Sequence, residues 1–483
     1  MRARERAADA PPVAVSGAAS GEARGAPMPP ALAAPAPAVP LLPPALAASA
    51  PAVPLPAALA PRLSGGAMFV LVFLPFALGH FLSTLMRTVN ATLAPQLVAS
   101  LQLTPGQLGL LTSAFFFAFA LAQLPVGMAL DRWGPARVQL PMLLLAGVGA
   151  LAFAGGQDFA QLLVARAVIG FGLGGCFMSA VKAISSWIAP TKLPSVHGYL
   201  IAVGGLGAAT ATLPVRMALH YTDWRGLFMV LAAMIACVGV LIWLVTPRAQ
   251  HQRAGGAPTV QSLCDVYRHP AFRKTIALVL LPHMVFFGVQ GLWIGRWLAD
   301  VAHYNDSIVA YLLYLGMAAV IFGAIAVGMV TEWAGRRGIA PLDVAAAGVA
   351  LFVAVQFAIV CNHAPSLRLL SVLFTLLGTI TGIEYAIIAQ TMPRDLTGRA
   401  ATCLNLLIFV GAFLVQAGFG WVIGLWEPDT SHRFPVQAYQ VAFGALALLQ
   451  LPGVVLYCLR RRPVECALGS LIRGEEDEVG SLR

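Results

Sequence analysis

The chain has 483 residues, of which 59 % are hydrophobic and only 10 % are charged, and its formal net charge is +10. Soluble proteins carry about a quarter charged residues, so this composition excludes a water-soluble domain and favours membrane-spanning helices of about 20 apolar residues. The excess positive charge lies mostly in short turns between apolar segments, which argues against a nucleic-acid partner. The seven cysteines form no C-x-x-C pair and are expected to be buried free thiols.

Residues 1–66 form a low-complexity stretch rich in alanine and proline. Proline recurs every few residues in its apolar part, which excludes a spanning helix because proline removes a backbone donor and clashes with the preceding turn. We expect a disordered cytoplasmic tail without a cleaved signal peptide. The alternative is a start site placed too far upstream, since Met68 directly opens the first apolar span.

Twelve apolar segments follow, and each is long enough to cross a bilayer. They are expected near residues 68–94, 107–130, 138–156, 160–187, 197–219, 226–246, 275–299, 307–330, 340–361, 367–391, 401–425 and 437–459. Basic residues concentrate in one set of alternating loops, and the opposite set carries little beyond three arginines. Because basic loops stay on the cytoplasmic side, both termini are predicted to be cytoplasmic.

The longest interior connection, residues 247–274, is polar and basic and is expected to be a cytoplasmic linker. It separates a predicted N-terminal six-helix bundle (67–246) from a C-terminal one (275–460), and a charged cytoplasmic tail follows (461–483). The predicted fold class is therefore an all-α integral membrane protein, with twelve transmembrane helices in two pseudo-symmetric six-helix bundles.

A glycine- and arginine-rich turn after the second span recurs after the eighth. The first copy reads G-M-A-L-D-R-W-G-P-A-R at 127–137, and the second reads G-M-V-T-E-W-A-G-R-R at 328–337. The shared glycine–acid–glycine spacing indicates two copies of one unit, in which the glycines permit close backbone approach. The residues expected to form a conformational gate are Gly127, Asp131, Arg132, Gly134, Arg137, Gly328, Glu332, Gly335, Arg336 and Arg337.

The first copy resembles, at every position, the G-x-x-x-D-R-x-G-x-x-R loop between the second and third helices of the major facilitator superfamily. The second copy departs from it at Glu332, Trp333 and Gly338. The resemblance implies a secondary transporter whose two six-helix halves rock around a midplane site. It also implies that the twin turns latch the cytoplasmic side in the outward-open state.

Polar residues line one face of the first span, where His80 and Arg87 lie seven residues apart with two hydroxyl residues between them. Polar groups are costly in a membrane and usually face a cavity or a partner, so both are candidates for substrate binding. The alternative is that Arg87 snorkels outward. The segment 87–95 resembles the first helix of the anion:cation symporter branch, which implies an arginine facing an anionic substrate. Met86 stands where many of those porters have an acid, so proton coupling by that acid is not implied.

The fourth span opens with R-A-V-I-G-F-G, which matches the R-x-x-x-G-x-G pattern of the same superfamily. Glycines at this spacing let helices approach closely. Arg166, Gly170 and Gly172 are therefore expected to fix helices together rather than to bind solute. Farther along the span, Lys182 is expected to point into the central cavity and to contact substrate.

Glu384 in the tenth span is the one carboxylate that the sequence places well inside a span. Measured back from the next proline, its position nearly matches that of Lys182, which predicts that the two are pseudo-symmetric partners. Two roles remain open. Glu384 carries a coupling proton by switching between environments, or it forms a permanent ion pair with Lys182.

Gln290 and Trp293 recur at a spacing of three in the seventh span, which suits a wall that orients a ligand. The alternative for Trp293 is an aromatic belt at the membrane interface. Asn405 in the eleventh span is expected to add a hydrogen bond to the substrate.

Together these features predict a monomeric secondary active transporter in the bacterial inner membrane that moves a small organic, anionic solute. A proton or another ion is the expected coupling partner, and no cofactor or metal is expected. Export of a metabolite or drug is the alternative. Nitrate is disfavoured because the nitrate porters, which this chain resembles in general pattern, place an arginine in helices two and eight, and 107–130 and 307–330 contain none. A membrane enzyme is disfavoured since no H-E-x-x-H is present, and a sensor since the tails are too short for a signalling domain.

Overall fold

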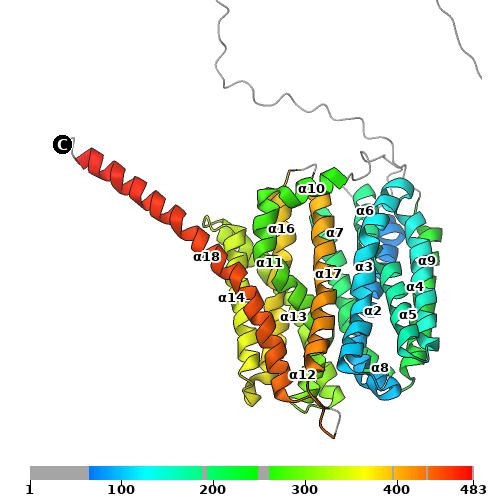
Figure 1. Cartoon of the computed structure of the whole chain (residues 1–483). Helices are drawn as coiled ribbons and strands as arrows, with labels where there is room; N and C mark the ends of the chain where they lie inside the picture. The colour runs from blue at the N-terminus through cyan, green and yellow to red at the C-terminus, as the bar shows by residue number, and fades with distance from the viewer. Residues whose placement is uncertain (1–64, 188–192, 248–259, 394–395, 431–432, 481–483) are drawn as a thin grey trace, which may run out of the picture. The chain divides into compact units, whose positions relative to one another are not determined.

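The computed structural model describes residues 65–187, 193–247, 260–393, 396–430 and 433–480, and these ranges contain helices and connecting turns but no strand. Twelve helices are long and apolar enough to cross a membrane, which confirms the predicted number and their order. They run side by side in Figure 1. Their bounds are Gly66–Leu101, Pro105–Leu130, Pro135–Gly155, Phe159–Trp187, Gly198–Ala218, Trp224–Val245, Pro270–Asp300, Asp306–Gly335, Pro341–Val360, Ala364–Thr391, Thr397–Ile423 and Val436–Leu459.

The first six spans form one bundle. Its elements are α1 (Gly65–Met68), a π turn η2 (Phe69–Phe73), α2 (Leu74–Leu101), α3 (Pro105–Trp133), α4 (Pro135–Gly155), α5 (Phe159–Leu173), α6 (Cys176–Trp187), α7 (Leu193–Thr210), α8 (Leu213–Ala218) and α9 (Trp224–Val245). Helix α2 packs against α6, α7 and α9, while α5 packs against both α3 and α4. The fourth span is divided at Gly174 and Gly175, where α5 ends and α6 begins.

The last six spans form the second bundle, preceded by α10 (Val260–Arg268). Its elements are α11 (Pro270–Gly288), the π turn η4 (Val289–Trp293), α12 (Ile294–Asp300), α13 (Asp306–Gly335), α14 (Pro341–Val360), η5 (Ala364–Ser366), α15 (Leu367–Gly378), the 3₁₀ turn η6 (Thr379–Gly382), α16 (Ile383–Thr391), α17 (Thr397–Ile423) and α18 (Val436–Gly480). Helix α18 continues through residues 461–480, where the sequence predicts a tail, because alanine, leucine, glutamate and arginine in this stretch favour helix.

Local sequence signals explain most helix ends. Helix α3 begins at a capping box, in which the Gln107 amide donates to Thr104 Oγ1 at 3.2 Å and the Thr104 amide donates to Gln107 Oε1 at 3.0 Å. The first span was expected to end before Pro95, but α2 continues to Leu101. Proline is tolerated inside a transmembrane helix because neighbouring groups satisfy the freed backbone. The helix ends instead where Gln102 adopts a positive φ of 51°.

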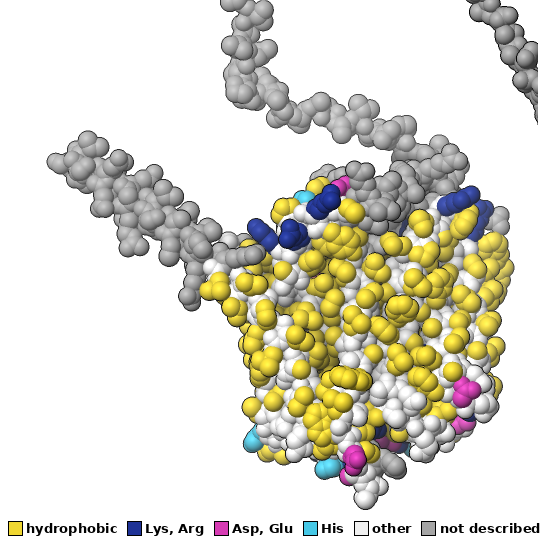
Figure 2. Space-filling model, in the orientation of Figure 1, with side chains coloured by type: hydrophobic (Ala, Val, Ile, Leu, Met, Phe, Trp, Pro, Cys, Tyr) yellow, Lys and Arg dark blue, Asp and Glu magenta, His cyan; other side chains and the backbone are white. Residues whose placement is uncertain are grey.

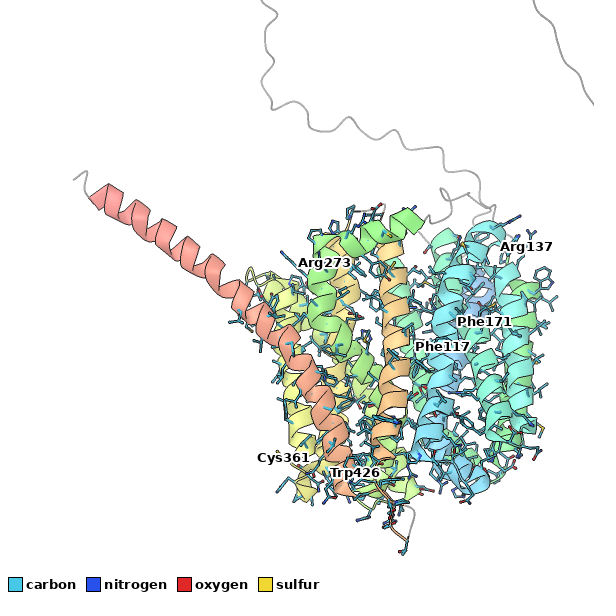
Figure 3. All side chains as sticks on the ribbon, in the orientation of Figure 1. Phe117, Arg137, Phe171, Arg273, Cys361 and Trp426 are labelled. Carbon is cyan, nitrogen blue, oxygen red and sulfur yellow. The ribbon has the colours of Figure 1, made fainter. Side chains whose placement is uncertain are left out.

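The two ends of the helices differ in charge. Lysine and arginine side chains gather at the end where α10 lies, and an apolar band separates them from the opposite end, where acidic side chains are more frequent (Figure 2). Figure 3 places Arg137 and Arg273 at the first end, and Cys361 and Trp426 at the other. We call these the basic end and the opposite end.

The two bundles meet where α3 packs against α17, α7 and α8 pack against α13, and α2 packs against η4 and α12. The rings of Phe119 and Phe409 lie 4.4 Å apart across the first pair. At the opposite end, Arg216 Nη2 lies 3.2 Å from Asp306 Oδ2, so an ion pair joins α8 to α13. The interface therefore contains both apolar and charged contacts.

In the first of the twin turns, Gly134 is non-helical, but no neighbouring backbone approaches Gly127 closely. Gly134 ends α3 with φ of 80°, a conformation that glycine adopts without a Cβ clash. At Gly127, however, an added Cβ would meet nothing within 4 Å. The expectation of close backbone approach there was wrong, since this turn of α3 faces open space. Arg132 and Arg137 are exposed as expected, and the side chain of Asp131 lies outside the described part of the chain.

The second turn is built differently despite the matched spacing. Gly335 is still helical and Gly338 takes the positive φ, at 76°. Glu332 and Arg336 form an exposed i,i+4 ion pair at 2.6 Å, and the Arg337 guanidinium stacks on Trp333 at 3.8 Å. Because the positive φ lies at Gly338 rather than at Gly335, the chain reverses about one turn of helix later in this copy. An added Cβ at Gly328 or Gly335 would also meet nothing within 4 Å.

Candidate solute-binding site

A cavity of about 750 Å³ lies between the two bundles. Helices α2 and α7 contribute its wall on the N-terminal side, with Phe116 of α3, and α11, η4 and α13 contribute its wall on the C-terminal side. Its polar lining residues are His80, Thr84, Arg87, Thr88, Tyr199 and Gln290. None of the residues that line this cavity is acidic, so arginine supplies its one permanent charge.

Arg87 faces this cavity, which decides between the two orientations left open by the sequence. Its guanidinium lies 4.9 Å from the centroid of the Phe287 ring, on the facing bundle. A cation stacked on an aromatic ring gains about 0.5–2 kcal/mol and keeps its hydrogen-bond donors free at the rim of the guanidinium plane. The arginine is therefore held in place by a contact that leaves its N–H groups available to a ligand.

His80 lies on α2, seven residues before Arg87. Its imidazole packs against Gly204 of α7, where a Cβ would collide with the ring, and lies 5.1 Å from the ring of Phe177. Thr84, on the next turn, donates to the Gly204 carbonyl at 2.7 Å and fastens α2 to α7. Nδ1 of His80 has no partner among the described residues, so the imidazole retains a polar atom for a ligand.

Gln290 reaches the cavity from the π turn η4. Such turns insert one extra residue into a helix and often occur at functional sites. Its Oε1 accepts a hydrogen bond from Thr375 Oγ1 at 2.7 Å, while its Nε2 has no partner in the described structure. The amide is therefore oriented by one contact and offers a free donor.

Trp293 does not line this cavity. It is only 1 % exposed, which excludes the interface belt. Its Nε1 donates to the Gln416 carbonyl at 2.9 Å, and its ring stacks on Phe419 at 5.1 Å. Trp293 instead lines a second pocket, of about 1260 Å³, whose lining also includes Trp426 of the opposite end.

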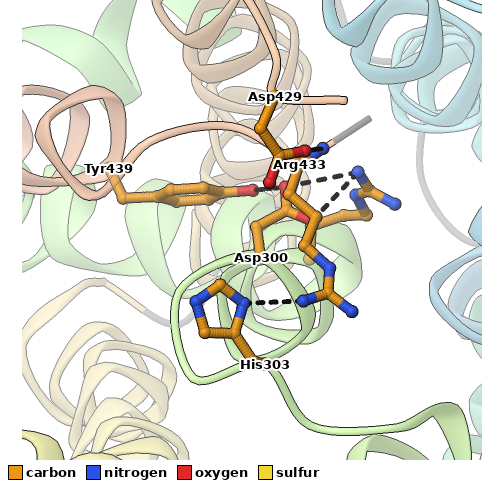
Figure 4. A network of polar contacts seen from close by, with 6 residues as sticks. Asp300, His303, Asp429, Arg433 and Tyr439 are labelled. Atoms are coloured by element: carbon orange, nitrogen blue, oxygen red, sulfur yellow. Dashed lines mark hydrogen bonds and ion pairs between the residues drawn. The ribbon is translucent and has the colours of Figure 1, made fainter. Parts of the chain in front are cut away.

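A polar network, drawn in Figure 4, includes the pocket-lining residues Asp300, Arg433 and Tyr439. Asp300 is its centre: Oδ1 lies 3.1 Å from Arg296 Nη2, and Oδ2 accepts from Tyr439 Oη at 2.6 Å. Arg433 approaches His303 Nδ1 at 2.7 Å. Sequence reasoning missed this network because its members come from α12, the loop after it, the segment before α18, and α18 itself.

Glu384 has a different partner from the one expected. Its Oε1 lies 2.5 Å from Nδ1 of His283 on α11, and the carboxylate is 0 % exposed. Lys182 instead donates to the backbone carbonyl of Leu130 at 2.8 Å, at the basic end of α3. The expected Lys182–Glu384 ion pair is therefore replaced by a His283–Glu384 pair. That expectation rested on the distance of each residue from the next proline, which gives its height along the span but not the partner of its side chain.

Asn405 lies outside the cavity lining and joins the two bundles instead. Its Nδ2 donates to Gln123 Oε1 on α3 at 2.8 Å, and its Oδ1 accepts from Tyr385 Oη at 3.0 Å. Gln123 in turn donates to the Gly174 carbonyl at 3.1 Å. A chain of hydrogen bonds thus runs from α16, next to Glu384, to the break in the fourth span.

Arg166 contacts both α2 and α3, in agreement with the predicted role of fixing helices together. It is 0 % exposed, donates to the Arg87 carbonyl at 3.4 Å and stacks on Phe115 at 4.9 Å. An added Cβ at Gly170 would collide with the Phe115 backbone, and one at Gly172 would lie 2.6 Å from the Ala146 amide nitrogen. These close approaches position Arg166 between α2 and α3, behind the cavity wall.

Two helical bundles of a membrane protein that enclose a cavity lined by hydrogen-bond donors define a transporter for a small solute. The chain belongs to the Major Facilitator Superfamily, whose family model matches residues 76–416. It is thus a multi-pass membrane transporter and not an enzyme.

The chain is similar to several transporters of this superfamily. It is 24 % identical to the probable sulfoacetate transporter SauU of Cupriavidus necator over 403 residues, which cover 77 % of this chain and 90 % of that protein. It is 26 % identical to the gentisate transporter of Corynebacterium glutamicum over 380 residues, covering 75 % and 81 %. Its fold is similar to the crystal structure of an inward-facing bacterial homologue of the human lysosomal transporter Spinster, with a TM-score of 0.67, 17 % identity, and coverage of 81 % and 96 %.

Proposed function

We propose that this protein imports a small organic anion across the bacterial inner membrane by alternating access, driven by protons that move in the same direction. The observation that carries the proposal is Arg87, a fixed cation in a cavity whose lining contains no carboxylate. An anionic group that entered the cavity would meet this charge without a competing internal partner.

The donors of the cavity suit a carboxylate or a sulfonate. A guanidinium binds such groups through two parallel N–H···O bonds, and these charge-assisted bonds are roughly twice as strong as neutral ones. Gln290 Nε2 and the imidazole of His80 are further donors with no partner in the described structure. The likeness to transporters named for sulfoacetate and gentisate, both organic anions, supports the same class of solute.

The distribution of charge supports an orientation. Basic loops stay on the cytoplasmic side of a membrane, so we place the basic end in the cytoplasm, together with both termini. In this orientation the twin turns, with Arg132 and Arg336 at the basic end, are positioned to latch that side when the cavity opens outward. The transporter is proposed to act as a monomer, because the cavity is complete within one chain.

Uptake into proteoliposomes tests the proposal. With an inwardly directed proton gradient, radiolabelled sulfoacetate or gentisate should accumulate in vesicles that contain the wild-type protein. Arg87→Gln should reduce uptake at least about 30-fold, because removing one partner of a buried charged contact costs about 2–5 kcal/mol and each 1.4 kcal/mol is about tenfold. Arg87→Lys should retain part of it, and Arg273→Gln, at the exposed basic end, should match the wild type.

The direction of the gradient separates import from the alternative, export of a metabolite or drug. Accumulation that requires an outwardly directed gradient would favour the exporter. Equal uptake by Arg87→Gln and the wild type would contradict the assignment of Arg87 as the anion-binding cation.

A further inference from the structure

The buried pair formed by His283 and Glu384 has no role in holding the solute, since neither residue lines the cavity. Both side chains lie in the hydrophobic interior, on α11 and α16. Ionisable groups at membrane depth are costly and mark ion pathways or proton relays. A buried pair of ionisable groups in this position therefore indicates a function in addition to helix packing.

We propose that His283 and Glu384 hold one transferable proton, that His283 is its point of entry, and that the pair and Arg87 sense each other's charge across Phe287. This inference rests on the proposed function, for which it names the proton site and its link to the anion site.

Exposure indicates the order in which the proton moves. The His283 side chain is 6 % exposed, whereas that of Glu384 is 0 % exposed. Glu384 Oε1 faces His283 Nδ1, and Oε2 has no partner among the described residues. A proton therefore reaches the carboxylate through the imidazole and not directly from water.

The transfer balances without any other reactant. A proton binds Nε2 of the neutral imidazole, and the proton on Nδ1 passes to Oε1 of the Glu384 carboxylate. The imidazole is again neutral, in its other tautomer, and the glutamate is a neutral acid. The pair thus changes from a net charge of minus one to zero, and in an apolar interior the neutral acid and neutral imidazole avoid the desolvation of two charges.

Phe287 lies between this pair and the anion site. Its ring centroid is 5.0 Å from that of the His283 imidazole and 4.9 Å from the Arg87 guanidinium carbon. The imidazole therefore lies within roughly 10 Å of the guanidinium, and the Glu384 carboxylate is bonded to that imidazole. Unit charges at about this separation shift one another's binding equilibria about tenfold in a protein. Phe287 and Arg87 both line the cavity, so the interaction acts along the cavity wall.

The sign of the charge interaction between Arg87 and the pair favours binding of the anion and the proton together, as symport requires. When the pair is deprotonated, its negative charge offsets part of the Arg87 field and weakens attraction for an anion. Protonation removes that offset, so the anion binds more tightly. By linkage, a bound anion must favour protonation of the pair by the same factor.

Few other titratable groups face the pair. On its own helix, Tyr385 lies edge-on to His283, with ring centroids 6.4 Å apart. On α14, Asp343 accepts from Tyr457 Oη at 2.5 Å. On α17, the titratable residue Cys403 belongs to the apolar cluster around Ile388. Arg87 is therefore the charge of the N-terminal bundle that acts on the pair, across Phe287.

Infrared difference spectroscopy of the purified, solute-free protein tests the proposal directly. The carbonyl stretch of a protonated carboxylic acid should appear as the pH is lowered, and Glu384→Gln should abolish it. His283→Gln should keep the band but shift its midpoint, because the imidazole partner is lost. The matched exposed variants His363→Gln and Glu427→Gln should titrate like the wild type.

Arg87 supplies the decisive comparison. Arg87→Gln should raise the midpoint of the Glu384 band by about one pH unit, the equivalent of the tenfold linkage, because a nearby cation opposes protonation. Arg87→Lys retains the charge and should leave the midpoint unchanged. A midpoint that is equal in the wild type and Arg87→Gln, or a titration unaffected by His283→Gln, would overturn the inference. Since no solute is present, a failed uptake assay would reject the proposed function while these spectra still judge the pair.

Discussion

The two bundles divide the charges of the membrane interior between them. In the N-terminal bundle, Arg87 and Arg166 are adjacent, and Arg166 is bonded to the backbone of Arg87 rather than to an acid. In the C-terminal bundle, the buried carboxylate of Glu384 is bonded to an imidazole. One bundle therefore presents a permanent positive charge, and the other holds a group whose charge a proton can cancel. In the proposed mechanism, coupling between anion and proton acts across the interface between the two bundles.

The fourth helix of each bundle is interrupted, and the two interruptions have different consequences. In the N-terminal bundle, the break after α5 directs Lys182 to the Leu130 carbonyl at the basic end. In the C-terminal bundle, the 3₁₀ turn η6 brings Glu384 to His283. The two positions nearly match in the sequence repeat, and the second lies beside Phe287, whose ring also contacts Arg87.

The largest effect on stability is expected at the close helix contact of the N-terminal bundle. In Gly170→Ala, the new Cβ would collide with the Phe115 backbone and separate α5 from α3. Overpacking of this kind costs about 1–3 kcal/mol, so the thermal unfolding midpoint should fall by several degrees. Gly418→Ala in the C-terminal bundle meets nothing within 4 Å and should not lower it. Equal midpoints for both variants would contradict the close packing around Arg166.

A smaller effect is expected at Lys182, whose substitution sharpens the contrast with Arg87. Lys182 does not line the cavity, so Lys182→Gln should leave anion affinity within about twofold of the wild type, the ordinary scale for a remote substitution. Equilibrium binding measures this directly. A tenfold loss would instead support the substrate contact predicted from the sequence.

The smallest effect is expected at the second twin turn. Glu332 and Arg336 are 68 % and 76 % exposed, and their ion pair lies on the helix surface. Exposed pairs contribute about 0–1 kcal/mol, so Glu332→Gln should change the thermal midpoint by no more than about a degree. A larger fall would show that this turn makes contacts beyond the exposed pair.

The fold was predictable from the sequence because each apolar run is long enough to span a bilayer and polar turns separate the runs. The cavity face of α2 was predictable as well, since His80 and Arg87 recur at helical spacing within a run where polar groups are costly. Both properties are local: they depend on residues within one helix and not on how helices pack.

The partners across helices were not predictable in the same way. His283 and Glu384 are 101 residues apart, and their meeting depends on the rotation of α11 and on the 3₁₀ turn before α16. A usable signal existed, because His283, Phe287 and Gln290 follow the spacing of one helical face. Lys182 was misplaced because its distance from the next proline gives its height along the span but not its partner, which is the Leu130 carbonyl of α3.

Equilibrium binding of the two organic anions used in the uptake assay tests the central claim, that Arg87 in the cavity between the bundles holds the solute. The wild-type protein should bind at least one of them saturably, Arg87→Lys should bind it more weakly, and Arg87→Gln should show no specific binding. Saturable binding of equal affinity in the wild type and Arg87→Gln would contradict the claim.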